Sequence, residues 1–241
     1  MAEAIAEEIA EPRTVYFEAR KLLDCKLFLP DSFDPSREYP LVIGLHGYGG
    51  SPEGLAGLWT YFPNRDFILA IPEAPYAYPG NGVKMGDKFS WDFKVPDKNL
   101  WQKADPWVYE YILRVVGDLQ KEYKISTTVL FGFSQGVAYA YAAGFHSEGL
   151  VDGLICFGGT FPSPDRYPWL LDEITIKSGA GLRIFIAHGK TDQVISSERS
   201  IRAVEKLRGY QCEVEIHLFD GGHMLPKAAV RKAFAWFDIS S

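Results

Sequence analysis

Several strand-like segments of this 241-residue chain are continuous apolar runs rather than alternating ones. Continuous runs are typical of strands that are covered on both faces, since alternation arises where one face meets water. Amphipathic segments of helical period separate the runs, and this rhythm favours a mostly parallel sheet. The sequence therefore predicts an α/β fold with helices on both faces of the sheet. The expected strands are 14–20 and 22–30, as a hairpin or two edge strands, then 40–46, 67–72, 127–133, 151–159, 182–188 and 212–219.

Four amphipathic or small-residue segments predict the main helices. The first is expected to begin at Asp105, because aspartate is a good N-cap and the following Pro106 suits the first helical position. The second, 135–146, is rich in small residues and can pack close to a sheet. The residues expected on buried helix faces are Trp107, Val108, Tyr111, Ile112, Val115, Val116, Leu119 and Tyr123 in the first; Ile201, Val204 and Leu207 in a third that runs from Ser196 or Ser197 to Gly209; and Val230, Phe234 and Phe237 in a fourth from about Pro226.

Length and composition fit one large domain, which we place at residues 14–241 behind an acidic N-terminal segment at 1–13. A net charge of -6 gives no basic surface, which disfavours a nucleic-acid partner. Three widely spaced cysteines predict neither a disulfide framework nor a metal site. The start of the chain lacks the pattern of a secretory signal, and no apolar run is long enough for a membrane span. We expect a cytoplasmic enzyme or binding protein.

The segment GFSQG places Ser134 between two glycines, directly after an apolar run. A serine on a tight strand-to-helix turn needs small residues two positions away on each side, since side chains there would collide with the neighbouring strand and helix. Such a turn also puts the serine at a helix N-terminus, where N–H groups favour negative charge. The pattern alone is equally consistent with a strand end that carries an ordinary serine, so its meaning depends on other residues.

A serine nucleophile needs a base, and the base needs an orienting acid. In open parallel sheets such groups are expected beyond the carboxyl ends of strands. His223 lies on a glycine-rich turn after the last expected strand and is the predicted base, whereas His188 is interpreted as a structural hydrogen-bonding residue. Asp192 follows the strand before it and is the predicted acid. Asp220 is the alternative, but it shares the turn of His223.

The remaining part of such a catalytic site would be an oxyanion hole. The backbone N–H of Gln135 follows the serine, and a second donor is expected from LHGYGGS, 45–51, with Tyr48 favoured. The alternatives for this loop are an ordinary glycine-rich turn and a phosphate-binding loop. It lacks the usual nucleotide-binding patterns, which disfavours the second alternative.

Together, LHGYGGS, GFSQG, AHGKTDQV and DGGH resemble the phospholipase/carboxylesterase family of α/β-hydrolases, which includes the acyl-protein thioesterases. The likeness spans about residues 22–238. It implies an eight-stranded sheet without a large cap, no cofactor, and hydrolysis of carboxylic esters or thioesters. By position it also implies Ser134 as nucleophile, Asp192 as acid, His223 as base, Tyr48 and Gln135 as oxyanion donors, and contacts to substrate from Trp91, Gly47 and Val194.

One long stretch, 73–104, shows little periodicity and carries several aromatic residues. Long loops inside a compact domain are usually functional or disordered, and the aromatic content argues against disorder. The stretch is interpreted either as a wall or lid over a binding site or as a satellite core.

The sequence thus predicts a serine esterase that acts on a small-molecule ester through an acyl-enzyme, with no nucleic-acid partner. An acyl-protein thioesterase or lysophospholipase is the alternative, and a non-catalytic hydrolase-fold binding protein is a less favoured one. The oligomeric state is left open, with a homodimer among the alternatives.

Overall fold

The computed structural model describes residues 21–78, 87–92 and 98–239. Its centre is a seven-stranded sheet of order β1-β3-β2-β6-β7-β8-β9. Only the β1–β3 pair is antiparallel, so the prediction of a mostly parallel sheet is confirmed. The strands are β1 (Cys25–Phe28), β2 (Tyr39–Leu45), β3 (Ile68–Pro72), β6 (Ile125–Phe133), β7 (Gly153–Phe157), β8 (Arg183–Gly189) and β9 (Glu213–Phe219), with a separate two-stranded sheet of β4 (Tyr76–Ala77) and β5 (Phe89–Ser90).

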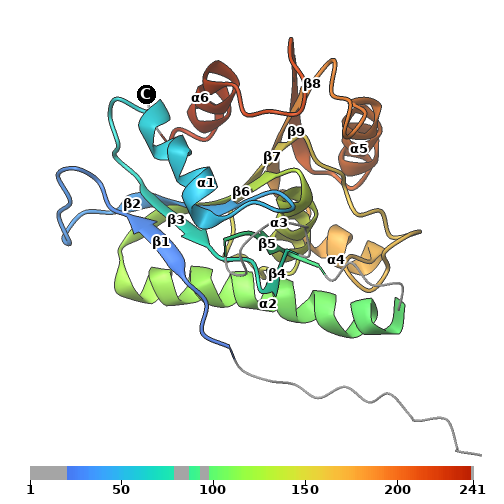
Figure 1. Ribbon diagram of the computed structural model, residues 1–241, viewed down its shortest axis with the longest axis horizontal. Coiled ribbons are helices and arrows are strands. Elements are labelled where there is room, and N and C mark those ends of the chain that lie inside the picture. Colours follow the sequence, from blue (N-terminus) through green and yellow to red (C-terminus); the bar gives the residue numbers. More distant parts are fainter. Residues whose placement is uncertain (1–20, 79–86, 93–97, 240–241) are drawn as a thin grey trace, which may run out of the picture.

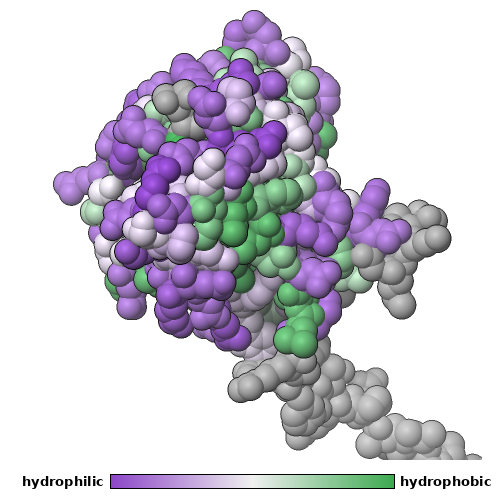
Figure 2. All heavy atoms as spheres, turned by 90° about the vertical axis from the view of Figure 1, so that its left-hand side faces the viewer, coloured by the Kyte–Doolittle hydropathy of each residue, from purple (hydrophilic) through white to green (hydrophobic). Residues whose placement is uncertain are grey.

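Seven of the eight expected strands form this sheet. The remaining one, 14–20, lies outside the described residues, as does the acidic segment 1–13. Within the described chain β1 is therefore one of the two edge strands, with Leu27 39% exposed. Figure 2 shows the side of the molecule that includes this edge, where apolar side chains gather in a patch with hydrophilic residues around it.

Helices cover both faces of the sheet, as the sequence predicts (Figure 1). On one face lie α2 (Lys98–Glu122), α3 (Gln135–Phe145), α4 (Glu173–Ser178) and α5 (Glu198–Gly209). On the other lie α1 (Pro52–Ala56), the 3-10 helix η1 (Gly57–Tyr61) and α6 (Lys227–Trp236). No helix of the described residues has both the length and the apolar character needed to cross a membrane.

The helix α2 begins earlier than expected. It starts at Lys98, so Asp105 is an interior residue instead of the N-cap, and Pro106 lies inside the helix. Proline at an interior position removes one backbone hydrogen bond. The carboxylate of Asp105 does not cap the helix. It accepts hydrogen bonds from the side chains of Tyr139 and Trp169, at 2.8 Å each.

The buried faces of the helices match the sequence pattern in their central positions and differ at the margins. Val108, Ile112 and Val116 of α2 are at most 1% exposed, whereas Trp107, expected in the same stripe, is 41% exposed. In α5, which begins after Ser197 as predicted, Ile201 is likewise 41% exposed and lies outside the buried face. A long side chain at the edge of an apolar stripe is only partly covered by its neighbours, which the spacing alone does not reveal.

The core between α6 and the sheet depends on Phe234. Its side chain is fully buried, and its ring lies 4.5 Å from that of Phe62 and 5.4 Å from that of Phe67. We expect Phe234→Ala to lower the free energy of unfolding by about 3–5 kcal/mol, because truncation of a buried aromatic residue leaves a cavity. Chemical denaturation measures this loss. The control Ile174→Ala, at a side chain that is 80% exposed, should change stability by no more than about 0.5 kcal/mol.

Candidate active site

Ser134 lies at the junction of β6 and α3 in a backbone conformation that few side-chain-bearing residues adopt. Its φ is 54° and its ψ is -114°, which costs about 1–3 kcal/mol when the surrounding structure enforces it. A Cβ at Gly136 would collide with the carbonyl oxygen of Leu45, and one at Gly132 would lie 2.8 Å from the Cα of Val137. The two glycines therefore allow β6, α3 and the end of β2 to approach closely around the serine.

The loop after β2 packs directly against this turn. A Cβ on Gly47 would lie 3.2 Å from the Cβ of Ser134, so the expected oxyanion loop touches the serine. Tyr48, the next residue, lines the same cavity as Ser134. Gln135 is the first residue of α3, and N–H groups in the first turn of a helix have no acceptor within the helix.

Residues 89–91 hold the loop after β2 in place. The N–H of Gly49 donates to the carbonyl of Phe89 at 2.9 Å, and the N–H of Phe89 donates to the carbonyl of Gly50 at 2.8 Å. The indole N–H of Trp91 donates to the carbonyl of His46 at 2.8 Å. The loop is thus fixed from outside, by a segment more than 35 residues further along the chain.

The same segment also holds the residue after the serine. The side-chain oxygen of Gln135 accepts the N–H of Trp91 at 3.0 Å, and its amide nitrogen donates to the hydroxyl of Ser90 at 3.0 Å. Trp91 is fully buried and does not line the cavity, so the prediction that its side chain contacts substrate is corrected. Its ring instead supports the two loops on either side of it.

The described part of the aromatic stretch 73–104 matches the wall interpretation only in part. Tyr76, Phe89 and Trp91 pack into the main core instead of a separate satellite core. Trp101, which lies in α2, lines the cavity as a wall would. Residues 79–86 and 93–97 lie outside the described chain.

The predicted acid and base form a hydrogen-bonded pair. Nδ1 of His223 lies 2.7 Å from Oδ2 of Asp192, while Oδ1 of Asp192 accepts the N–H groups of Val194 at 2.8 Å and Ile195 at 2.9 Å. Burial raises the pKa of Asp192, but these hydrogen bonds outweigh it and hold the pKa below its ordinary value. Asp192 is thus ionised and can only accept, so Nδ1 of His223 carries its proton.

His188 is a second histidine partner of Asp192. Its Nε2 lies 2.8 Å from the carbonyl oxygen of Ile195 and 3.3 Å from Oδ2 of Asp192, and both groups can only accept. Its Nδ1 lies 2.8 Å from the hydroxyl of Ser200, which can donate. His188 therefore carries a proton on Nε2, and it is fully buried with a partner at both nitrogens. The sequence identifies His188 as a structural hydrogen-bonding residue but does not reveal that it reaches the predicted acid.

The Asp192–His223 pair lies beside the serine turn. The ring of His223 lies 4.9 Å from that of Phe133, the residue before Ser134. A Cβ on Gly158, just after β7, would lie 3.3 Å from Nδ1 of His223. The carboxyl ends of β6, β7, β8 and β9 thus bring Ser134, Asp192 and His223 together. This agrees with the expectation that sites in parallel sheets lie beyond the carboxyl ends of the strands.

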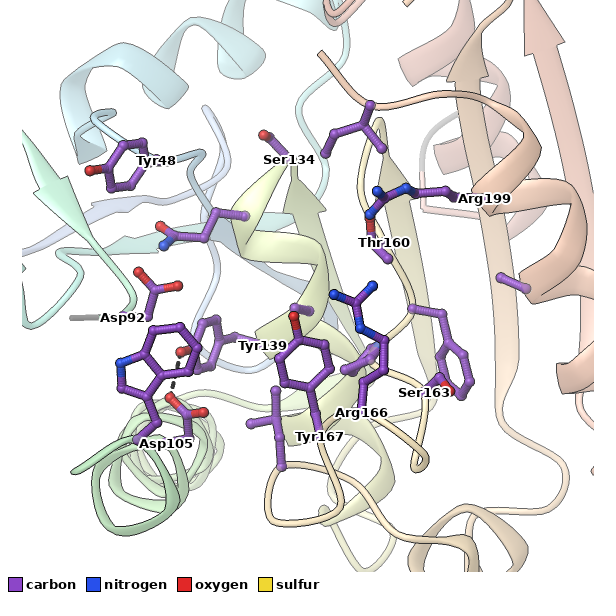
Figure 3. A pocket seen from close by; sticks show the side chains of 18 of the residues that line it. Tyr48, Asp92, Asp105, Ser134, Tyr139, Thr160, Ser163, Arg166, Tyr167 and Arg199 are labelled. Atoms are coloured by element: carbon purple, nitrogen blue, oxygen red, sulfur yellow. Dashed lines mark hydrogen bonds between the residues drawn. The ribbon is translucent and has the colours of Figure 1, made fainter. Parts of the chain in front are cut away.

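A cavity of about 640 Å³ opens beside Ser134. Figure 3 shows Tyr48 and Asp92 on one side of the serine and Arg166 and Arg199 on the other. Val194, expected to contact substrate, is 69% exposed and lies outside the lining, and Ile195 lines the cavity in its place. The contribution of Val194 in the structure is its backbone hydrogen bond to Asp192.

Asp105 forms a buried polar network in the cavity wall. Tyr139 and Trp169 donate to its two oxygens, and the first of these bonds is drawn in Figure 3. Burial raises the pKa of Asp105 and the two hydrogen bonds only partly oppose this shift. Within the described ranges no group of three or more His, Cys, Asp or Glu side chains could hold a metal ion.

The close approach at the serine turn can be tested with matched glycine substitutions. Gly136→Ala should lower the free energy of unfolding by about 1–3 kcal/mol, because the new Cβ meets backbone that cannot move aside. Gly117→Ala in α2, where a Cβ meets nothing within 4 Å, should raise stability by about 0.5–1 kcal/mol. Urea denaturation measures both changes. Equal effects of the two substitutions would contradict this account of the turn.

The role of His188 can be tested by removing its nitrogens while keeping its bulk. In His188→Phe, the hydroxyl of Ser200 and the carbonyl of Ile195 each lose a buried partner. Each loss should lower the free energy of unfolding by about 1–3 kcal/mol. Ser200→Ala removes one partner alone and should lower the free energy of unfolding by less. Thermal and chemical unfolding compare the two variants with the wild type, and a His188→Phe variant of unchanged stability would disprove the network.

The comparisons with known proteins agree on one family. The family model described as "Phospholipase/Carboxylesterase" matches residues 34–241. In sequence, the chain is 23% identical over 200 residues to the protein named "Putative hydrolase MhqD" of Bacillus subtilis (strain 168), covering 82% of this chain and 92% of that protein.

Two solved structures share the fold. Esterase PE8 superimposes with a TM-score of 0.69 at 22% identity, covering 91% of this chain and 99% of that one. The Bacillus cereus carboxylesterase gives a TM-score of 0.67 at 22% identity, and the match covers 90% of this chain and 94% of that one. Since the family model spans most of the chain and the fold agrees, the protein belongs to the phospholipase/carboxylesterase family of α/β-hydrolases.

Proposed function

We propose that this chain is a serine esterase that hydrolyses carboxylic esters through an acyl-enzyme on Ser134. The observation that carries the proposal is the strained turn at Ser134, which lies beside a hydrogen-bonded Asp192–His223 pair. The positive φ of Ser134 costs free energy, and strain of this kind at a cavity is typical of a functional residue.

Acyl transfer would begin at His223. Because Nδ1 is held by Asp192, Nε2 is the nitrogen that can accept the hydroxyl proton of Ser134. The serine oxygen then attacks the ester carbonyl, and the protonated His223 donates its proton to the departing alcohol. Water then attacks the acyl-enzyme in the same way, with His223 again as base. The serine oxygen leaves, takes the proton back from His223, and the acid is released.

The negative charge on the carbonyl oxygen would be held by the backbone N–H groups of Tyr48 and Gln135. Gly47 lies against Ser134 and Gln135 opens α3, so both donors come from segments that touch the serine. Preorganised donors of this kind are usually the largest single contribution to acyl-transfer catalysis. The polar support from Trp91 and Ser90 would keep the donors from relaxing during the reaction.

Asp192 would fix the imidazole tautomer and stabilise its charged form. Its carboxylate is already oriented by the N–H groups of Val194 and Ile195, so it need not reorganise when His223 becomes charged. Its pKa lies below the ordinary value, which keeps it ionised throughout the neutral range.

The cavity favours compact, polar substrates over long acyl chains. A lysophospholipid or a lipidated protein thioester would need an extended apolar groove. The wall here contains the ionisable side chains of Asp92, Asp105, Arg166, Arg199, Arg202 and Lys206. A panel of esters and thioesters of increasing acyl length separates these substrates, and the proposal expects short acyl groups to be hydrolysed fastest.

Labelling by a fluorophosphonate probe tests the nucleophile. Wild-type protein should be labelled, and Ser134→Ala should lose labelling and about 10⁴–10⁶ in turnover of a short ester, as in other serine hydrolases. Ser178→Ala, at an exposed serine near the end of α4, should leave both unchanged.

Two outcomes would contradict the proposal in different ways. Folded wild-type protein that neither reacts with the probe nor hydrolyses any ester of the panel would exclude a serine esterase. Labelling that survives Ser134→Ala would show that another residue is the nucleophile.

A further inference from the structure

One wall of the cavity is strongly cationic in a protein of net charge -6. The wall contains Arg166, from the segment after β7, and Arg199, Arg202 and Lys206 of α5. The carboxylates that line the cavity, Asp92 and Asp105, are drawn on the opposite side in Figure 3. The cationic and the acidic side chains of the lining therefore lie on opposite sides of the cavity.

Two of the four cations already have carboxylate partners outside the cavity lining. Arg202 lies 3.7 Å from Glu198, and Lys206 lies 3.3 Å from Asp165. These partners reduce the charge that the two residues offer to a ligand.

Arg166 and Arg199 differ from their neighbours. Neither forms an ion pair with any carboxylate of the described chain. The guanidinium of Arg166 lies over the ring of Tyr167, 5.6 Å from its centroid, which orients the group without neutralising it. Figure 3 shows both guanidinium groups pointing into the cavity near Thr160, on the side of Ser134 away from Tyr48.

We propose that the substrate is an ester that carries a second, ionised carboxylate, held by Arg166 and Arg199 while its ester carbonyl lies at Ser134. This inference rests on the proposed esterase function and names the class of ester. A planar guanidinium binds a carboxylate through two parallel hydrogen bonds, and two such groups at one point make a site for a single anion. A local positive field on an otherwise acidic protein also attracts an anionic substrate selectively.

The carboxylate can belong to the acyl part or to the alcohol part of the ester. A half-ester of a dicarboxylic acid represents the first, and an ester of a hydroxybenzoic acid represents the second. Both place an anion some distance from the carbonyl, which is the arrangement that the cavity provides, and the experiment distinguishes them.

The test compares esters in which a carboxylate replaces a methyl group. The acyl pair is mono-para-nitrophenyl glutarate and para-nitrophenyl pentanoate, and the alcohol pair is para-acetoxybenzoate and para-tolyl acetate. For one of the pairs, wild-type kcat/KM should be about tenfold or more higher for the anionic ester, the effect of one charge-assisted hydrogen bond. The double variant Arg166→Gln/Arg199→Gln should lower that ratio of anionic to neutral ester by at least about tenfold.

Arg114→Gln is the matched control. Arg114 is an exposed arginine of α2 that does not line the cavity, so its replacement makes the same arginine-to-glutamine change and removes one positive charge away from the site. It should leave the ratio at its wild-type value. Fluorophosphonate labelling and circular dichroism verify that each variant is folded. If the double variant does not fold, the wild-type ratio is measured against ionic strength, and it should fall as salt screens the exposed arginines.

The outcomes separate this inference from the proposed function. A wild-type enzyme that cleaves both members of each pair without preference would overturn the inference and leave the esterase proposal intact. A preference that survives the double variant, or that does not change with salt, would also overturn it. A wild-type protein that cleaves none of the four esters would contradict the esterase proposal itself.

Discussion

The site depends on one steric constraint, the contact between the start of α3 and the end of β2. Because Gly136 has no side chain, the backbone of α3 reaches the carbonyl of Leu45. The chain that continues from Leu45 is the loop whose Gly47 lies against Ser134. This backbone contact therefore brings the serine close to both N–H groups proposed to hold the oxyanion, and the positive φ of Ser134 adds a conformational cost to the turn.

Buried hydrogen bonds then hold the loops that this contact brings together. Trp91 bonds to the carbonyl of His46 on one side and to the side chain of Gln135 on the other, so it links the two proposed oxyanion segments. Asp192 is held in a similar way, by backbone N–H groups and by two histidines. The buried polar groups of Trp91 and Asp192 thus have partners within the protein, which limits their movement when charge develops nearby.

The sequence predicted the backbone of the site better than its side chains. Continuous apolar runs located the strands, and the strand ends then located Asp192 and His223, because the carboxyl edge of a parallel sheet is set by topology alone. The direction of Trp91, and the extension of α2 back to Lys98, depend on tertiary contacts that no local pattern encodes. The cavity-lining Arg199 could have been noticed from its place in the first turn after a carboxyl-end loop, but not its orientation.

The proposed chemistry and the proposed selectivity of this site belong to physically different parts of the chain. The serine turn is built from close backbone contacts, so its residues are constrained by packing as well as by any reaction. Arg166 and Arg199 are exposed residues whose long side chains reach the cavity from the surface, and they contribute little to the core. Exchange of such residues usually changes stability by less than about 0.5 kcal/mol. If the proposed function holds, the cavity wall can change its charge without disturbing the packing of the turn, as expected where one fold supports many substrates.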